Sequence, residues 1–245
     1  MFNFFSENAP INGTFRICGS DYNHVKNVLR MKIGENLLVN FDGISNLCQI
    51  SSFGEDYAEV SVIEENYQNT SLPIEIYLFQ GLPKSDKLEL IIQKTVELGV
   101  NKIIPVEMSR SIVKIEPKKA ESKVSRWQAI AESAAKQSTR TVIPSVEMPV
   151  SFSKALELAK DLDLLLVPYE NKNGMKDTVD AFSLIKPDMK VGVIIGPEGG
   201  FSESEIEKTL LIGGKVISLG KRILRTETAA ILSVGAIMLH AETHL

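Results

Sequence analysis

Two short stretches near the C-terminus each place a glycine-containing turn directly after an apolar run. They are residues 194–201 (IIGPEGGF) and 218–230 (SLGKRILRTETAA). An apolar run that ends in a glycine turn is typical of a strand leading to a ligand site at the carboxyl edge of an open α/β sheet. The two stretches therefore predict such a sheet and a small-molecule site, with a nucleotide-like cofactor as the first hypothesis.

The C-terminal two thirds of the chain alternate between strand-like and helix-like patterns. Short apolar runs predict strands at residues 74–79, 102–106, 162–167, 191–195 and 216–219. Apolar stripes predict helices at 85–98, at 202–212 behind a capping box formed by Ser202 and Glu205, and at 228–241. The last helix is expected to bury Ile231, Leu232, Gly235, Met238 and Leu239. This alternation predicts a mainly parallel α/β sheet flanked by helices over residues 74–245.

The first 70 residues have a different, β-rich pattern. Apolar runs at 36–41, 47–51 and 57–63, separated by turn residues, predict a small antiparallel barrel or sheet. Asp21 is expected to cap one helix over 22–31, and the polar stretch 64–73 is the expected domain boundary.

Composition indicates a folded protein of one large or two smaller domains, with 245 residues of which 44% are hydrophobic and 24% charged. Cys18 and Cys48 are far apart and lack metal-site spacing, so we expect free, buried or partly buried thiols and no metal. The N-terminal residues lack a basic segment followed by an apolar run, and no stretch approaches the roughly 20 apolar residues of a membrane span. The sequence thus predicts a cytoplasmic protein.

Charge is distributed unevenly. The formal net charge is −4, yet residues 80–140 carry 12 basic and 7 acidic side chains, and residues 214–245 carry 4 and 2. A localised basic face is what binding to a nucleic-acid backbone requires. The alternative is a solvated surface with unevenly placed lysines.

The first glycine stretch does not fit a phosphate-binding loop. It lacks the lysine and Ser/Thr of a P-loop and the spacing of a dinucleotide fingerprint. Glu198 stands in the middle of the turn, where it would repel a triphosphate and favour a cationic ligand such as S-adenosylmethionine. The alternative for this stretch alone is a tight strand-to-helix turn.

The second stretch narrows the choice, because Lys221, Arg222 and Arg225 lie within five residues before Thr226 and Glu227 lead into a helix. Both stretches and the capped helix between them resemble the C-terminal signature of SPOUT methyltransferases. Further segments resemble the bacterial family that methylates N3 of a uridine in 16S ribosomal RNA; they are 24–35 (HVKNVLRMKIGE), 40–43 (NFDG), 84–100 (KSDKLELIIQKTVELGV), 103–114 (IIPVEMSRSIVK) and 126–144 (RWQAIAESAAKQSTRTVIP).

The resemblance implies a PUA-like β-barrel RNA-binding domain over residues 1–70 and a SPOUT-type domain with a C-terminal trefoil knot over 74–245. It also implies S-adenosylmethionine as cofactor, 16S ribosomal RNA or the 30S subunit as partner, and a homodimer. One departure is Asn3, where the family usually has a basic residue, so an N-terminal phosphate contact is expected to be absent.

The same resemblance suggests roles for individual residues. Arg225 is expected to stabilise the negative charge that forms when the uracil loses its imide proton, with phosphate binding as its alternative. Glu198 or Glu227 would orient the base or accept its proton, and Glu198 could equally neutralise the cofactor or brace the turn. The expected cofactor contacts are Gly196, Pro197, Glu198, Gly199, Ser218, Leu219, Gly220, Ile223 and Leu224. The expected RNA contacts are His24, Arg30, Lys84, Lys87, Lys94, Arg110, Lys114, Arg126 and Arg140, whereas Trp127 is expected to pack in the core.

Two other functions remain open from the sequence. One is a SPOUT enzyme that methylates the ribose 2′-oxygen of RNA. The other is a ribosome-assembly factor that binds RNA without catalysis.

Overall fold

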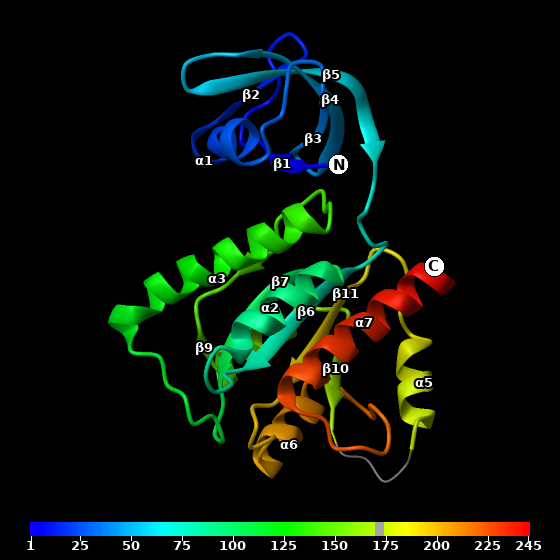
Figure 1. Cartoon of the computed structure of the whole chain (residues 1–245). Helices are drawn as coiled ribbons and strands as arrows, with labels where there is room; N and C mark the ends of the chain where they lie inside the picture. The colour runs from blue at the N-terminus through cyan, green and yellow to red at the C-terminus, as the bar shows by residue number, and fades with distance from the viewer. Residues whose placement is uncertain (170–173) are drawn as a thin grey trace. The chain divides into compact units, whose positions relative to one another are not determined.

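The chain divides into two compact units in the computed structural model, which describes residues 1–169 and 174–245 (Figure 1). The first unit comprises Met1–Ser71 and Ala135–Ile143, and the second comprises Leu72–Ala134 and Pro144–Leu245. No pattern in the sequence indicated that residues 135–143 would join the N-terminal unit.

The N-terminal unit is built on a five-stranded mixed sheet with the order β1-β3-β4-β5-β2. Its strands are β1 (Asn3–Phe5), β2 (Thr14–Cys18), β3 (Asn36–Phe41), β4 (Ile44–Phe53) and β5 (Tyr57–Gln68). All pairings are antiparallel except that of β1 with β3, which is parallel. Because β5 extends to Gln68, the expected boundary at 64–73 begins too early: its first residues pair with β4 instead of forming a linker.

Alternating residues of these strands form the core of the unit, including Phe15, Leu37, Ile50 and Val60. A short helix α1 (Gly19–Asn23) and a single π-helical turn η1 (His24–Val28) cover part of it. The predicted cap at Asp21 is wrong, because the helix already begins at Gly19. The Asp21 carboxylate instead accepts a hydrogen bond of 2.7 Å from the Lys136 ammonium, a partner distant in sequence.

Both cysteines are free, but only one matches the expected burial. Cys48 lies in the core, where burial raises the pKa of its thiol to about 12. Cys18 is exposed, because it lies at the end of edge strand β2. Trp127 is buried in the second unit, as expected.

The second unit contains a parallel seven-stranded sheet with the order β12-β10-β11-β6-β7-β8, and β9 also pairs with β7. The strands are β6 (Glu75–Gly81), β7 (Val100–Glu107), β8 (Ser145–Val146), β9 (Val150–Ser151), β10 (Leu164–Pro168), β11 (Lys190–Ile195) and β12 (Lys215–Ile217). The predicted parallel α/β sheet is confirmed. Since β11 lies between β10 and β6, strands from distant parts of the chain end side by side.

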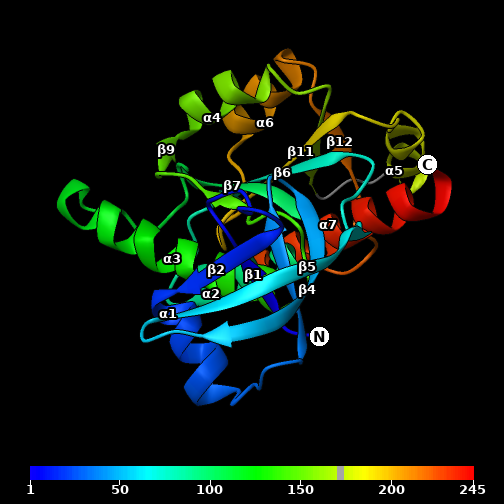
Figure 2. The ribbon, with the colours of Figure 1, turned by 90° about the horizontal axis from the view of Figure 1, so that it is seen from above.

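Helices cover both faces of this sheet. They are α2 (Lys87–Glu97), α3 (Pro117–Gln137), α4 (Phe152–Ala159), α5 (Lys176–Phe182), α6 (Glu203–Leu211) and α7 (Thr226–His244). Helices α4 and α6 pack on one face, where Phe79, Ile104 and Ile194 meet Leu156 and Phe201. Helix α7 lies on the other face (Figure 2), and α2 packs against it there.

The predicted buried face of the last helix is wrong. The buried side chains of α7 are Thr226, Ala230, Ser233, Val234, Ile237 and Ala241. Leu232 and Leu239, expected to be inside, are 43% and 58% exposed. This helix is apolar on nearly every side, so periodicity alone cannot select the face that packs.

The start of α6 follows the sequence closely. The Ser202 hydroxyl accepts a hydrogen bond from the Glu205 N–H (3.3 Å), and the Glu205 carboxylate accepts one from the Ser202 N–H (2.8 Å). The predicted capping box is therefore confirmed. None of the helices within the described residues is both long and apolar enough to cross a membrane.

Candidate functional site

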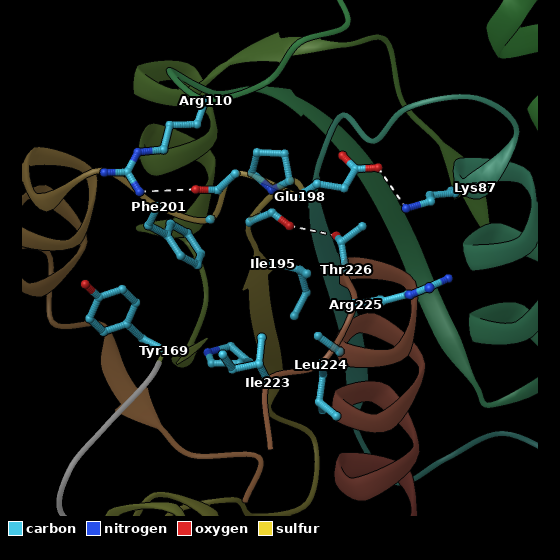
Figure 3. Close-up of a pocket in the computed structure, with 16 residues that line it drawn as sticks. Lys87, Arg110, Tyr169, Ile195, Glu198, Phe201, Ile223, Leu224, Arg225 and Thr226 are labelled. Carbon is cyan, nitrogen blue, oxygen red and sulfur yellow. Dashed lines mark hydrogen bonds and ion pairs between the residues drawn. The ribbon is translucent and has the colours of Figure 1, made fainter. Parts of the chain in front are cut away.

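A pocket of about 910 Å³ lies at the carboxyl ends of β10 and β11 and at the start of α7 (Figure 3). It is lined by Lys87, Arg110, Pro168, Tyr169, Ile195, Gly196, Pro197, Glu198, Gly199, Gly200, Phe201, Ile223, Leu224, Arg225, Thr226 and Ala229. We call residues 196–201 the GPEGGF loop and residues 218–225 the SLGKRILR loop. The two glycine stretches singled out in the sequence thus meet at one pocket.

Thr226 joins the two stretches directly. Its buried hydroxyl donates a hydrogen bond to the Gly196 carbonyl (2.7 Å) and accepts one from the Gln80 side-chain amide (3.0 Å). Gln80 is fully buried near the end of β6. These contacts tie the ends of β6 and β11 to the first residue of α7. Neither residue was a candidate from the sequence, because only the sheet order brings Gln80 next to Thr226.

The GPEGGF loop is held in a tight conformation by its glycines. Gly200 has a φ of +67°, a region that favours glycine, and its N–H donates to the Pro197 carbonyl (2.9 Å). A Cβ atom on Gly199 would lie 2.8 Å from Cβ of Arg110, which is too close. The Arg110 guanidinium donates a hydrogen bond to the Gly199 carbonyl (3.1 Å). The glycines therefore let this loop pack against the segment that follows β7.

Glu198 is paired with a cation at the pocket wall. Its carboxylate lies 3.0 Å from the Lys87 ammonium and accepts a hydrogen bond of 3.1 Å from the Lys84 N–H. Burial raises the pKa of Glu198, whereas hydrogen bonds from Lys87 and from the N–H groups of Glu198 and Lys84 lower it. The hydrogen bonds prevail, so the pKa lies below its ordinary value and Glu198 is ionised at neutral pH.

The other two candidate catalytic residues occupy different places. Arg225 precedes the first residue of α7, lines the pocket and is exposed. Within the part of the chain that the structure describes, no ion pair or hydrogen bond engages its guanidinium. Glu227 is turned toward α2, where its carboxylate lies 3.4 Å from the Lys87 ammonium.

Most of the expected cofactor contacts line the pocket, but the first residues of the SLGKRILR loop lie elsewhere. Ser218 and Leu219 line a second, apolar cavity of about 580 Å³ between α5 and α7. The Ser218 N–H and carbonyl both bond to the Thr178 hydroxyl of α5, each at 2.8 Å. Gly220 follows with a φ of +105°. The sequence also missed Ile195, Phe201 and Tyr169 of the main pocket, because apolar and aromatic residues at strand ends look like ordinary core.

The basic residues predicted to contact RNA have unequal surroundings in the second unit. Lys87 and Arg110 line the pocket, whereas Lys94 is paired with Glu97, and Arg126 with Glu89. Lys84 and Lys114 are exposed.

The other predicted RNA contacts, His24, Arg30 and Arg140, belong to the N-terminal unit. His24 and Arg30 are exposed, whereas burial lowers the pKa of Arg140 to about 10. Asn3 is buried in this unit, and its side chain donates to the Arg140 carbonyl (3.0 Å) and accepts from the Asn40 amide (2.6 Å). Position 3 therefore has an internal structural role in this chain.

Across residues 1–169 and 174–245, no three His, Cys, Asp or Glu side chains gather as a metal site would require.

Comparison with known proteins identifies the class. The family model of an RNA methyltransferase domain matches residues 70–238, and that of an RNA methyltransferase PUA domain matches residues 17–63. The parallel sheet with its pocket and the mixed N-terminal sheet are thus the two domains of an RNA methyltransferase.

Relatives narrow the class to one family. The chain is 40% identical over 241 residues to ribosomal RNA small subunit methyltransferase E of Bacillus subtilis, covering 96% of this chain and 93% of the relative. It therefore belongs to the ribosomal RNA small subunit methyltransferase E family, which confirms the resemblance seen in the sequence.

Solved structures agree with this assignment. A ribosomal RNA small subunit methyltransferase E from Neisseria gonorrhoeae, bound to S-adenosyl methionine, is 30% identical with a TM-score of 0.82, covering 98% of this chain and 97% of the other. A putative methyltransferase from Legionella pneumophila, in complex with the same cofactor, is 31% identical with a TM-score of 0.80, covering 97% and 96%.

Proposed function

We propose that this chain transfers the methyl group of S-adenosylmethionine to N3 of a uridine in 16S ribosomal RNA, acting in the cytoplasm on the small ribosomal subunit. The observation that supports it best is the meeting of the GPEGGF and SLGKRILR loops at one pocket, tied by Thr226 and Gly196. Membership of the ribosomal RNA small subunit methyltransferase E family supports the class of substrate.

The pocket suits S-adenosylmethionine in size and chemistry. Its volume of about 910 Å³ lies within the roughly 300–1,000 Å³ typical of small-molecule sites. Ile195, Phe201 and Leu224 offer apolar surface for the adenine, and glycine backbone groups are accessible for its polar edge. The ionised Glu198 attracts the cationic sulfonium and ammonium groups. S-adenosylmethionine, when bound, supplies the electrophilic methyl group.

Methyl transfer requires the target base to leave its stack and release its imide proton to solvent water. The N3–methyl bond then forms as the methyl–sulfur bond breaks, and the sulfur keeps the electron pair. The uracil anion carries charge on N3 and both carbonyl oxygens, so a nearby guanidinium lowers the barrier. We assign this role to Arg225, because it lines the pocket with no partner among the described residues.

Glu198 is better suited to hold the loop than to take the proton. Its lowered pKa makes it a weak base, and hydrogen bonds from Lys84 and Lys87 occupy its carboxylate. We therefore propose that it braces the GPEGGF loop and balances the charge of the cofactor.

RNA binding would use the exposed cations of both units. Arg110 lines the pocket, Lys84 contacts Glu198 of the pocket through its N–H, and Lys114 follows Arg110 by four residues. His24 and Arg30 belong to the PUA domain. Exposed cations can release counterions from the phosphate backbone.

We further propose the domain organisation and assembly that the family resemblance implies. Residues 1–70 would form the PUA-like domain and 74–245 the SPOUT-type domain with its trefoil knot. The hydrogen bonds between Ser218 and Thr178 support a knot. Ser218 directly follows β12, and Thr178 lies in α5, which connects β10 to β11, so the bonds hold the end of β12 against that connection. The apolar cavity between α5 and α7, with Val179 64% exposed, supports a homodimer.

The decisive experiment is transfer of a labelled methyl group to 30S subunits from cells lacking the modification, with free 16S RNA in parallel. Mass analysis of the nucleosides should find N3-methyluridine. A 2′-O-methyl product would replace the proposal with a ribose methyltransferase. Absence of transfer, together with absence of S-adenosylmethionine binding by calorimetry, would favour a non-catalytic RNA-binding factor.

A further inference from the structure

Lys87 lies between two carboxylates that come from distant parts of the chain. It is the first residue of α2, and its ammonium lies 3.0 Å from Glu198 of the GPEGGF loop and 3.4 Å from Glu227 in the first turn of α7. The side chains of Lys87, Glu198 and Glu227 are 31%, 27% and 14% exposed. Figure 3 shows Lys87 reaching toward Glu198 at the edge of the pocket.

These contacts form a closed ring of interactions at one wall of the pocket. On one side, the Thr226 hydroxyl bonds to the Gly196 carbonyl. On the other, Lys87 bridges Glu198, two residues after Gly196, and Glu227, the residue after Thr226. The GPEGGF loop and the start of α7 are therefore pinned together at two points. One point is a buried neutral hydrogen bond, and the other is an ionic bridge through α2.

The charges around Lys87 do not favour a phosphate contact. One ammonium between two carboxylates leaves a net negative charge, which repels a phosphate and attracts a cation. To reach a phosphate, Lys87 would have to leave both carboxylates without their cation in a partly buried place, which is costly. A place in the basic segment is thus insufficient to make Lys87 an RNA contact.

We infer that Lys87 is a positioning residue for methyl transfer, whose ammonium holds the GPEGGF loop and the start of α7 in the arrangement that binds S-adenosylmethionine. This inference rests on the proposed function of the same pocket. Its consequence is that loss of Lys87 impairs cofactor binding and turnover more than RNA binding.

The bridge also affects the ionisation of Glu198. The charged groups that line the pocket with Glu198 are Lys87 from α2, Arg110 from the segment after β7 and Arg225 before α7, and Glu227 in the first turn of α7 shares the Lys87 ammonium. Burial raises the pKa of Glu198, and the hydrogen bond from Lys87 is the largest effect that lowers it. Removal of the ammonium should therefore raise the pKa of Glu198 and move the acid limb of the kcat profile to higher pH.

The kinetic test compares Lys87→Met and Lys87→Arg with Lys102→Met. Lys102 is a matched control, since it is 39% exposed and forms an ion pair with Glu147 at 3.3 Å. Lys87→Met should lower kcat by about tenfold to a hundredfold, as expected when reacting groups are misplaced. It should also weaken calorimetric binding of S-adenosylmethionine while leaving KM for RNA unchanged. Lys87→Arg should recover most of the activity, and Lys102→Met should behave as the unaltered chain.

The opposite pattern would overturn the inference. If Lys87→Met keeps its kcat but raises KM for RNA, and lowers the salt slope of RNA binding by about one, Lys87 is a phosphate contact. Unchanged kinetics and cofactor binding would also overturn it. Thermal unfolding of each variant shows whether it folds. If Lys87→Met is misfolded, the kinetics of Lys87→Arg are compared with those of the unaltered chain instead.

A second readout needs no catalysis. NMR titration of the Glu198 side-chain carboxyl carbon in the free full-length protein should show a higher pKa in Lys87→Met than in the unaltered chain. Equal pKa values would overturn the bridge. If the unaltered chain transfers no methyl group, the proposed function fails, whereas this titration still decides whether Lys87 controls Glu198.

Discussion

The two glycine-containing loops at the pocket differ in how firmly the protein holds them. The GPEGGF loop is bonded to Arg110, Lys84, Lys87 and Thr226, and Phe201 at its end is buried. The SLGKRILR loop is anchored at Ser218, but Lys221, Arg222, Ile223 and Arg225 are exposed. One loop is a preformed wall of the pocket, whereas the other carries exposed side chains that no ion pair engages within the described residues. Because the GPEGGF loop is already ordered, ligand binding would cost less conformational entropy there. The exposed cations of the SLGKRILR loop would remain available to the substrate.

The largest expected effect follows removal of Arg225, whose guanidinium has no partner among residues 1–169 and 174–245. Arg225→Ala should lower kcat by about 10²- to 10³-fold, as for loss of a donor to an oxyanion, because the uracil anion loses its stabilising charge. Single-turnover methyl transfer measures this change. Arg225→Lys is the informative companion, since lysine keeps the charge but not the planar fork. Full catalysis with weakened RNA binding in that variant would make Arg225 a phosphate contact.

The next effect tests the link between the loops. Thr226→Val should destabilise the fold by about 1–3 kcal/mol, since it leaves the buried Gly196 carbonyl without its hydroxyl donor and leaves the Gln80 amide with only its bond to the Gly81 carbonyl among the described residues. Urea unfolding measures the loss, and Thr226→Ser should restore most of it. Thr243→Val is the matched control, an exposed threonine of the same helix whose hydroxyl also bonds to a carbonyl. Equal losses in both variants would show that the link is not special.

A smaller effect concerns the support behind the GPEGGF loop. The Glu205 carboxylate accepts hydrogen bonds from the N–H groups of Ser202 and Ser109, both at 2.8 Å. Glu205→Gln should cost about 1–2 kcal/mol of unfolding free energy at neutral pH. Urea unfolding at several pH values measures the difference between the two proteins.

The pH dependence of that difference has a defined sign. Burial raises the pKa of Glu205, but the hydrogen bonds from Ser109 and Ser202 outweigh burial and lower it. A lowered pKa in the folded state means that the carboxylate stabilises the fold above its unfolded pKa of 4.5 and loses this contribution as the pH falls. The difference in unfolding free energy between the unaltered chain and Glu205→Gln should therefore become smaller as the pH falls. A difference that does not change with pH would mean that the negative charge of Glu205 does not stabilise the fold.

The smallest expected effect concerns the exposed part of the SLGKRILR loop. Ile223 is 90% exposed, so Ile223→Ser should leave stability within about 0.5 kcal/mol. If Ile223 covers the cofactor, calorimetry should show binding of S-adenosylmethionine weakened by less than about tenfold, the cost of losing a partly buried apolar side chain. Leu211→Ser, at a residue 85% exposed at the end of α6, is the matched control. Unchanged binding in Ile223→Ser would remove Ile223 from the site.

Local patterns explain which parts of the fold were predictable. The strands β3, β10 and β11 and the capping box of α6 depend on residues close in sequence, so periodicity and capping chemistry indicate them. Parallel pairing of β1 with β3 and inclusion of residues 135–143 in the first unit depend on contacts between distant residues. The prediction of the buried face of α7 was wrong for a different reason. This helix is apolar on nearly every side, so its sequence does not indicate which side packs against the sheet.

The site shows the same division. Glycines, a central glutamate and clustered arginines identified both loops, because these residue types are unusual together after apolar strands. Gln80 and Thr226 carried no such signal, and the prediction that Lys87 contacts RNA depends only on the basic character of its segment. The structure adds contacts between distant residues: Thr226 bonds to residues 146 and 30 positions away, and Lys87 to a residue 111 positions away.

The amino-acid sequence by itself predicted the two-part organisation, the parallel sheet and the two loops that line the pocket, because local composition and spacing indicate each of them. The family followed from the resemblance of several motifs to known sequences. Only the tertiary structure decided how those loops are joined. The sheet order places β11 beside β6 and brings α2 against α7, so that Thr226 reaches Gly196 and one lysine lies between two glutamates. Such pairings depend on packing across the whole domain, which no local pattern specifies.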